Sequence, residues 1–197
     1  PNGAGKTTVF NMLTGVYRFA ESKLWDAPFA PHDIGRYPLA CGQVYALNPH
    51  KHLLPHKIGY KRVYKSKSTK IYMPMFQMPV EECGNMLVME TNVALTTKST
   101  EFALSHVETL EKWCKYLIEF GADPGNQLCT DDFAGHFAHN ANLSVKAIVG
   151  IASYARMAQM QGLEDVAAKY LAVARDLAAQ WKEMSADGDH YKLTFDR

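Results

Sequence analysis

The feature that most constrains the fold is a helical repeat of apolar side chains that begins near residue 80 and continues to about residue 184. Apolar residues recur there at three- and four-residue intervals, a spacing that places them on one face of an α-helix. The clearest stretch has Ala103, Val107, Leu110, Cys114, Leu117 and Ile118 at these positions. The pattern predicts four helices, over about 80–95, 101–120, 142 or 144 to 161, and 164–184.

Short connections separate these predicted helices. Gly121 and Gly162 follow the last apolar positions of two helices, where glycine commonly ends a helix, and Asp123-Pro124-Gly125 has the composition of a turn. Short turns make successive helices antiparallel neighbours. We therefore expect an all-α domain over residues 80–197, built from two αα-hairpins in series, with a short strand over 190–195 near its end.

The N-terminal third has a different pattern. Prolines at seven positions between residues 28 and 79 interrupt any helix, so residues 21–79 are predicted to be irregular. No acidic residue occurs between Asp33 and Glu81, and all six lysines of this interval fall within a basic insert over residues 46–75. Such an insert could bind nucleic acid. We favour either a solvated, disordered insert or a translated non-coding stretch.

The first twenty residues form a separate segment that resembles part of a phosphate-binding loop. Gly5, Lys6 and Thr7 fit the end of the Walker A pattern, and residues 1–19 resemble the ATPase subunit of ABC transporters. The remainder of the chain has neither a Walker B segment nor a Leu-Ser-Gly-Gly-Gln signature. A nucleotide-binding transporter subunit is thus one alternative, and a stray segment joined to an unrelated sequence is the interpretation that we favour.

Composition limits the other classes. No run of 18 apolar residues is present, so no membrane span is expected, and no signal peptide is visible in the chain. The four cysteines have no CxxC spacing, so we expect no metal site.

Residues 131–144 are the most chemically dense segment. Two carboxylates, two imidazoles and two amides occur within these fourteen residues, namely Asp131, Asp132, His136, His139, Asn140 and Asn142. Adjacent carboxylates repel each other, which raises the pKa of one and prepares one acid and one base. Asp131 and Asp132 are therefore candidate catalytic residues, and Glu81 and Glu82 could supply the opposing wall of the site.

The remaining polar residues of this segment have two interpretations each. His136 and His139 would share a face with Asp132 if the loop turned helically, and the two asparagines suit a substrate carboxylate or amide, or the cap of the following helix. Glu81 and Glu82 lie in the first turn of a predicted helix, where acids also stabilise the helix dipole. Two carboxylates across a bond serve amide and glycoside hydrolysis equally well, so the residues alone leave both reactions open.

Four ordered blocks resemble the glutaminase A family. They are 25–40, which begins Trp-Asp-Ala-Pro-Phe; 77–86, which begins Gln-Met-Pro-Val-Glu-Glu; 126–148, which contains the polar segment; and 187–191, Asp-Gly-Asp-His-Tyr. The resemblance covers about residues 24–45 and 76–197. His32 and Asp33, in the first block, are assigned either to substrate binding or to fixing the Pro-rich segment.

The resemblance implies a fold and an activity. The fold is an α/α toroid of six helical hairpins, similar to that of several glycosidases, and the four predicted helices would form about a third of it. The implied reaction of an intact parent is hydrolysis of the small molecule L-glutamine to glutamate and ammonia, without a cofactor, by a secreted or periplasmic protein. A glycoside hydrolase of the same fold is the alternative. We interpret the chain as a chimeric fragment of such a protein and expect the isolated chain to be inactive.

Overall fold

A computed structural model describes residues 78–127, 129 and 137–196, and this part of the chain is mostly helical. Its elements are α3 (Pro79–Thr97), α4 (Glu101–Ser105), α5 (Val107–Phe120), α6 (Ala141–Met160), α7 (Glu164–Ser185), β1 (Ala186–Asp187) and β2 (His190–Tyr191). The prediction of an all-α fold is confirmed. The predictions for the phosphate-loop-like segment, the Pro-rich segment and the basic insert lie outside the described residues.

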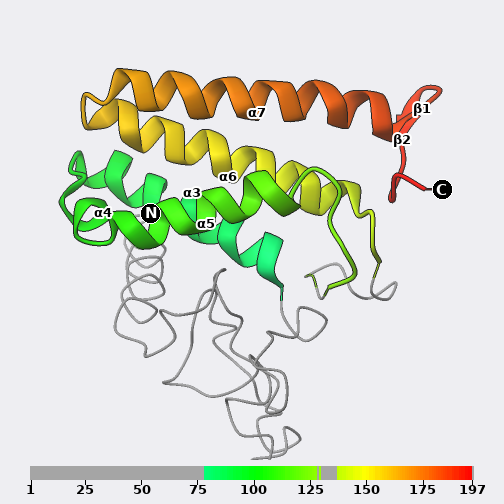
Figure 1. The fold of residues 1–197 in the computed structure, drawn as a ribbon, viewed down its shortest axis with the longest axis horizontal. Coiled ribbons are helices and arrows are strands. Elements are labelled where there is room, and N and C mark those ends of the chain that lie inside the picture. Colours follow the sequence, from blue (N-terminus) through cyan, green and yellow to red (C-terminus); the bar gives the residue numbers. More distant parts are fainter. Residues whose placement is uncertain (1–77, 128, 130–136, 197) are drawn as a thin grey trace, which may run out of the picture.

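The helices form a stack in which α6 is central. It packs against α7 on one side and against α3 and α5 on the other (Figure 1). Helices α3 and α6 run in one direction, and α5 and α7 run in the opposite direction (Figure 1). As predicted, the chain forms two antiparallel hairpins. The N-termini of α3 and α6 and the C-termini of α5 and α7 consequently meet at one end, at the right of Figure 1.

The hairpin of α6 and α7 follows its sequence closely. Gly162 has a φ of 75°, a left-handed conformation that glycine adopts without steric cost. The amide of Leu163 then donates to the carbonyl of Ala158 at 3.0 Å, which closes the turn. The predicted stop at Gly162 thus corresponds to a turn that requires that residue type.

The predicted helix 101–120 is broken at His106, where α4 ends and α5 begins. The hydroxyl of Ser105 and Nδ1 of His106 both contact the carbonyl oxygen of Phe102, at 2.7 and 3.0 Å. This carbonyl would otherwise accept the helical bond from the amide of His106, which donates to Ala103 instead. Side-chain competition for a backbone acceptor therefore interrupts a continuous apolar pattern.

The core lies where α3, α5 and α6 cross. Trp113, Leu117 and Ile151 are almost completely buried there. Gly84 of α3 faces Gly150 of α6 so closely that a Cβ on Gly150 would lie 2.9 Å from the Cα of Gly84. The close crossing brings the first turns of α3 and α6 within side-chain reach of each other.

The segment after α7 contains less strand than predicted. The strands β1 and β2 are two residues each, and the second covers only His190–Tyr191 of the expected 190–195. Thr194 instead forms an isolated antiparallel bridge with Asn140, at the start of α6. The chain end therefore folds back onto α6 rather than extending the small sheet. Within the described residues, no helix combines the length and apolar character needed to cross a bilayer.

Candidate active site at one end of the bundle

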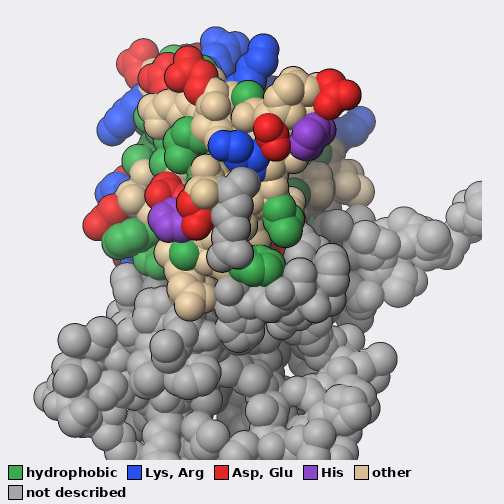
Figure 2. All heavy atoms as spheres, turned by 90° about the vertical axis from the view of Figure 1, so that its right-hand side faces the viewer, with side chains coloured by type: hydrophobic (Ala, Val, Ile, Leu, Met, Phe, Trp, Pro, Cys, Tyr) green, Lys and Arg blue, Asp and Glu red, His purple; other side chains and the backbone are tan. Residues whose placement is uncertain are grey.

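Several of the predicted site residues meet at the end of the bundle where α3 and α6 begin. We call this region the polar end and define it as residues 78–82, 121–127, 137–146 and 186–196. Glu81, Glu82, His139, Asn140 and Asn142 belong to it. The other predicted residues lie outside the described part of the chain: Asp131, Asp132, His136, His32, Asp33, Gly5, Lys6 and Thr7. Figure 2 views the molecule from this side, and histidine side chains on this face lie beside acidic ones.

Two buried carboxylates occupy the first turn of α3. Pro79 begins this helix, consistent with the preference for proline at its first positions, and Glu81 and Glu82 follow at 1% and 0% exposure. Acids in the first turn interact favourably with the free amides of a helix N-terminus. That interaction does not require burial, so burial of both side chains calls for further compensation.

Lys146 supplies this compensation for Glu81. Its Nζ lies 2.8 Å from Oε1 of Glu81, and the pair joins α6 to α3 across 65 positions of sequence. The lysine side chain keeps 26% of its surface exposed, whereas the carboxylate is buried. The ammonium therefore sits between the buried carboxylate and the surface.

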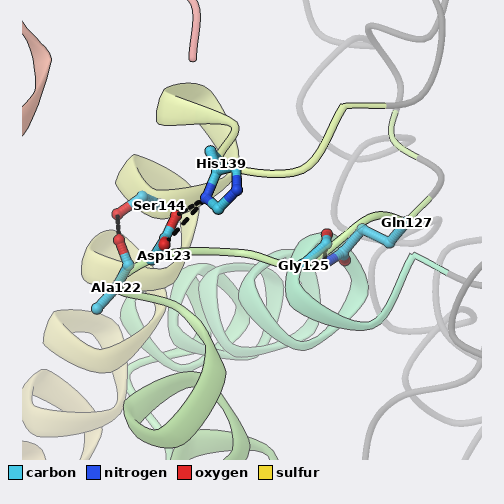
Figure 3. Close-up of polar contacts among 6 residues, drawn as sticks. All are labelled: Ala122, Asp123, Gly125, Gln127, His139 and Ser144. Atoms are coloured by element: carbon cyan, nitrogen blue, oxygen red, sulfur yellow. Dashed lines mark hydrogen bonds and ion pairs between the residues drawn. The ribbon is translucent and has the colours of Figure 1, made fainter. Parts of the chain in front are cut away.

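The loop after α5 is hydrogen-bonded to the first turns of α3 and α6. The Gln127 side chain accepts from the backbone amide of Val80 at 3.0 Å and donates to the carbonyl of Gly125 at 3.2 Å (Figure 3). Ser144, in the first turn of α6, donates its hydroxyl to the carbonyl of Ala122 at 3.0 Å (Figure 3). These bonds fix the loop over residues 121–127 against the first turns of α3 and α6.

Asn140 caps α6. Its side-chain oxygen accepts from the amide of Leu143 at 3.0 Å, and its amide nitrogen contacts Sγ of Cys129 at 3.9 Å. The residue is 2% exposed. Of the two roles considered for this asparagine, the structure shows capping. The helix consequently begins at Ala141, slightly earlier than the sequence pattern predicts.

Asn142 lies in the first turn of α6 and faces a groove between α3 and α6. The groove encloses about 400 Å³. Its lining combines three side-chain amides and one ammonium with apolar side chains, and consists of Asn85, Val88, Met89, Asn92, Asn142, Val145, Lys146 and Val149. A groove of this composition can hydrogen-bond a small polar molecule while contacting its aliphatic part.

His139, the residue before the N-cap of α6, is paired with Asp123 of the loop after α5. Its Nδ1 lies 2.8 Å from Oδ1 and 3.0 Å from Oδ2 of Asp123 (Figure 3). The hydrogen bond and the charge of Asp123 raise the pKa of the His139 imidazole above its usual range, and Asp196 adds to this effect. The residue has a φ of 60° and precedes the helix, so the helical turn on which its alignment with Asp132 depended is absent over residues 137–139.

Sequence reasoning did not assign Asp123 or Lys146 to the site. Asp123 was interpreted only as part of a turn, and its partner is 16 positions away. Lys146 lay within the family-like block 126–148, but nothing local indicated an ion pair with α3. Among the described residues, no group of three or more His, Cys, Asp or Glu side chains could hold a metal ion.

Comparisons with known proteins give one family and two relatives. The family model described as the glutaminase A six helical-hairpin domain matches residues 6–197, a wider span than the sequence blocks, and one that includes the basic insert. A protein named "Glutaminase A" from Aspergillus oryzae is 32% identical, over 90% of this chain and 22% of its own length. A protein named "Probable glutaminase" from Arthroderma benhamiae is 28% identical, over 60% of this chain and 20% of its own. The chain thus spans about a fifth of these relatives, and no solved structure matches it significantly.

Proposed function

Because the chain belongs to the glutaminase A six helical-hairpin domain family, we propose that the protein containing it hydrolyses the side-chain amide of L-glutamine to glutamate and ammonia. The relatives named as glutaminases support this choice of substrate. The observation that carries the proposal is the pair of buried carboxylates, Glu81 and Glu82, at the N-terminus of α3. Buried carboxylates are retained where they are compensated and useful, which is typical of active sites.

The reaction assigns different tasks to the residues of the polar end. Amide hydrolysis needs a base to activate water, a donor for the carbonyl oxygen and an acid for the departing nitrogen. We assign Glu81 and Glu82 to one wall of the site and Asp131 and Asp132 to the facing wall. Such a set of acids and bases can hydrolyse an amide without a cofactor, and we propose none.

Substrate recognition falls to the side chains around the carboxylates. L-Glutamine presents an α-carboxylate, an α-ammonium group and a short aliphatic stem. Asn142 lines the groove between α3 and α6, where amides lie beside apolar side chains, and it is proposed to bind one of the polar groups of the substrate. His136, His32 and Asp33 are proposed to complete the binding site.

Assays with three classes of substrate test the proposal. We would assay ammonia release from L-glutamine by the protein that contains the complete domain, and in parallel by the 197-residue chain. Nitrophenyl glycosides and ATP serve as alternative substrates on the same samples. Ammonia release by the complete protein without glycoside cleavage or ATP hydrolysis is the expected result. Glycoside cleavage without ammonia release would contradict the proposed amide hydrolysis and favour a glycoside hydrolase, the other reaction open to paired carboxylates.

A second comparison concerns the chain by itself. Its described part contains two hairpins, whereas the family domain is named for six. We expect the isolated chain to release far less ammonia than the complete protein. Equal specific activity of the two samples would show that the site is contained within this chain.

A further inference from the structure

We propose that His139 and Asp123 form a proton-transfer dyad at the polar end, in which His139 protonates the departing amide nitrogen and Asp123 is the positioning residue. This inference rests on the proposed amide hydrolysis. The C–N bond of the substrate breaks, the proton on Nε2 of His139 moves to the nitrogen, and ammonia leaves. The carbonyl carbon gains the oxygen of a water molecule, whose proton passes to a carboxylate of the site.

The geometry of the pair defines which ring nitrogen is available. Both carboxylate oxygens of Asp123 lie within 3.0 Å of Nδ1, so Nδ1 carries a hydrogen and donates it to the carboxylate. Every hydrogen bond described for this imidazole is made by Nδ1, so among the described contacts Nε2 is the ring nitrogen not engaged by Asp123. The two side chains are 44% and 46% exposed, so a small molecule can reach them. An aspartate that fixes one tautomer of a histidine is a recurrent arrangement in hydrolases.

The backbone of His139 is held in place from both sides. Its amide donates to the carbonyl of Pro124 at 2.7 Å, and its carbonyl accepts from the amide of Phe195 at 2.8 Å. Its φ of 60° lies in a region that non-glycine residues rarely adopt. Lys98, the other described non-glycine residue with positive φ, sits in the left-handed cap that commonly ends a helix. His139 precedes a helix instead, and although histidine is one of the residue types enriched in the left-handed region, the two backbone hydrogen bonds are what hold it there.

The charges around the imidazole suit an acid. Asp123 faces it from the loop after α5, and Asp196 approaches from the chain end. Both are acidic and favour the imidazolium form, in which each ring nitrogen holds a proton. The proton on Nδ1 is retained by Asp123, so the proton on Nε2 is the one available for transfer.

Two readouts test the dyad separately from the overall function. The first is ¹⁵N NMR titration of the His139 imidazole in the complete protein, assigned by comparison with His139→Gln. We expect the neutral imidazole of His139 to carry its hydrogen on Nδ1. Asp123→Asn should lower the pKa of this imidazole and weaken its preference for the Nδ1-protonated tautomer, and Asp123→Glu should restore the pKa and the tautomer in part. The control Asp176→Asn, at an exposed position of α7, should change neither.

The second readout is the pH profile of ammonia release. A general acid must be protonated, so activity falls as the pH rises through its pKa. Asp123→Asn is expected to move this alkaline limb to lower pH and to reduce kcat about a hundredfold, with little change in KM. An active protein whose rate, profile and NMR titration are all unaffected by Asp123→Asn would overturn the dyad. A wild-type protein that releases no ammonia would overturn the proposed function and, with it, the transfer to nitrogen, whatever the NMR titration shows of the pairing.

Discussion

The two halves of α3 bury carboxylates in different ways. At the polar end, Glu81 is buried against the ammonium of Lys146 at 2.8 Å. Nine residues further along the same helix, Glu90 is 1% exposed, and its Oε2 has no hydrogen-bond partner within the described part of the chain. Burial raises the pKa of the Glu90 carboxyl to about 7.

Glu81 and Glu90 illustrate two ways in which a helix accommodates a buried carboxyl group. At the polar end, a lysine from another helix forms an ion pair with the buried carboxylate of Glu81. Further along α3, the buried Glu90 has no such cation beside it among the described residues, and burial raises its pKa, so this carboxyl is tolerated chiefly in its neutral form. An ion pair with another helix therefore distinguishes the buried acid of the polar end from the one further along α3.

The largest effect on stability is expected from removing the charge of Lys146. Lys146→Met keeps most of the aliphatic stem, whose Cγ packs close to Gly84, and deletes only the charge. Glu81 would then be a buried carboxylate without its cation, so we expect the free energy of unfolding at pH 7 to fall by about 3–4 kcal/mol, measured by urea denaturation. The double variant Glu81→Gln/Lys146→Met should recover part of the loss. Unchanged stability in Lys146→Met would contradict the compensation of Glu81 by this lysine.

Glu90→Gln should have the opposite effect and depend on pH. The folded-state pKa of about 7 lies above the ordinary value of 4.5, so the contribution of Glu90 to stability is fully present below pH 4.5 and is lost as the pH rises through 7. We expect Glu90→Gln to stabilise the protein by about 3 kcal/mol at pH 8 relative to wild type, with little difference at pH 4. Glu183→Gln, at an exposed position of α7, is the control. A pH-independent effect of Glu90→Gln would show that burial does not perturb this carboxyl.

The smallest effect is expected at the cap of α6. Asn140→Ala removes the acceptor for the amide of Leu143 and should lower the free energy of unfolding by about 1 kcal/mol. Asn142→Ala, in the same turn, leaves the cap intact and should reduce stability by less than half that amount. Equal losses in thermal denaturation would argue against capping as the main contribution of Asn140.

Local patterns predicted the helices because the information lies within each helix. Apolar spacing located α3, α6 and α7 to within a few residues, and Gly162 indicated the turn between the last two. The break at His106 was missed because the side chain of Ser105 and the imidazole of His106 itself take over a backbone acceptor, which leaves the apolar spacing unchanged.

The polar end could be predicted only in part because its contacts join distant segments. The sequence indicated Glu81, Glu82 and His139 as site residues from their chemistry and family resemblance. It could not indicate that Lys146 reaches Glu81, or that Asp123 orients His139, because hairpin packing alone brings these pairs together. A turn aspartate and a helix lysine carry no local sign of such partners.

The most direct test of the polar end as the active site compares two isosteric changes on one helix. The measurement is kcat/KM for ammonia release from L-glutamine at pH 6 by Glu82→Gln and Glu90→Gln in the complete protein. Both side chains are buried carboxyls of α3, and only Glu82 belongs to the polar end. We predict a loss of about a hundredfold or more for Glu82→Gln and a value within about twofold of wild type for Glu90→Gln. Full activity in Glu82→Gln, or a larger loss in Glu90→Gln, would contradict the assignment of the active site to the polar end.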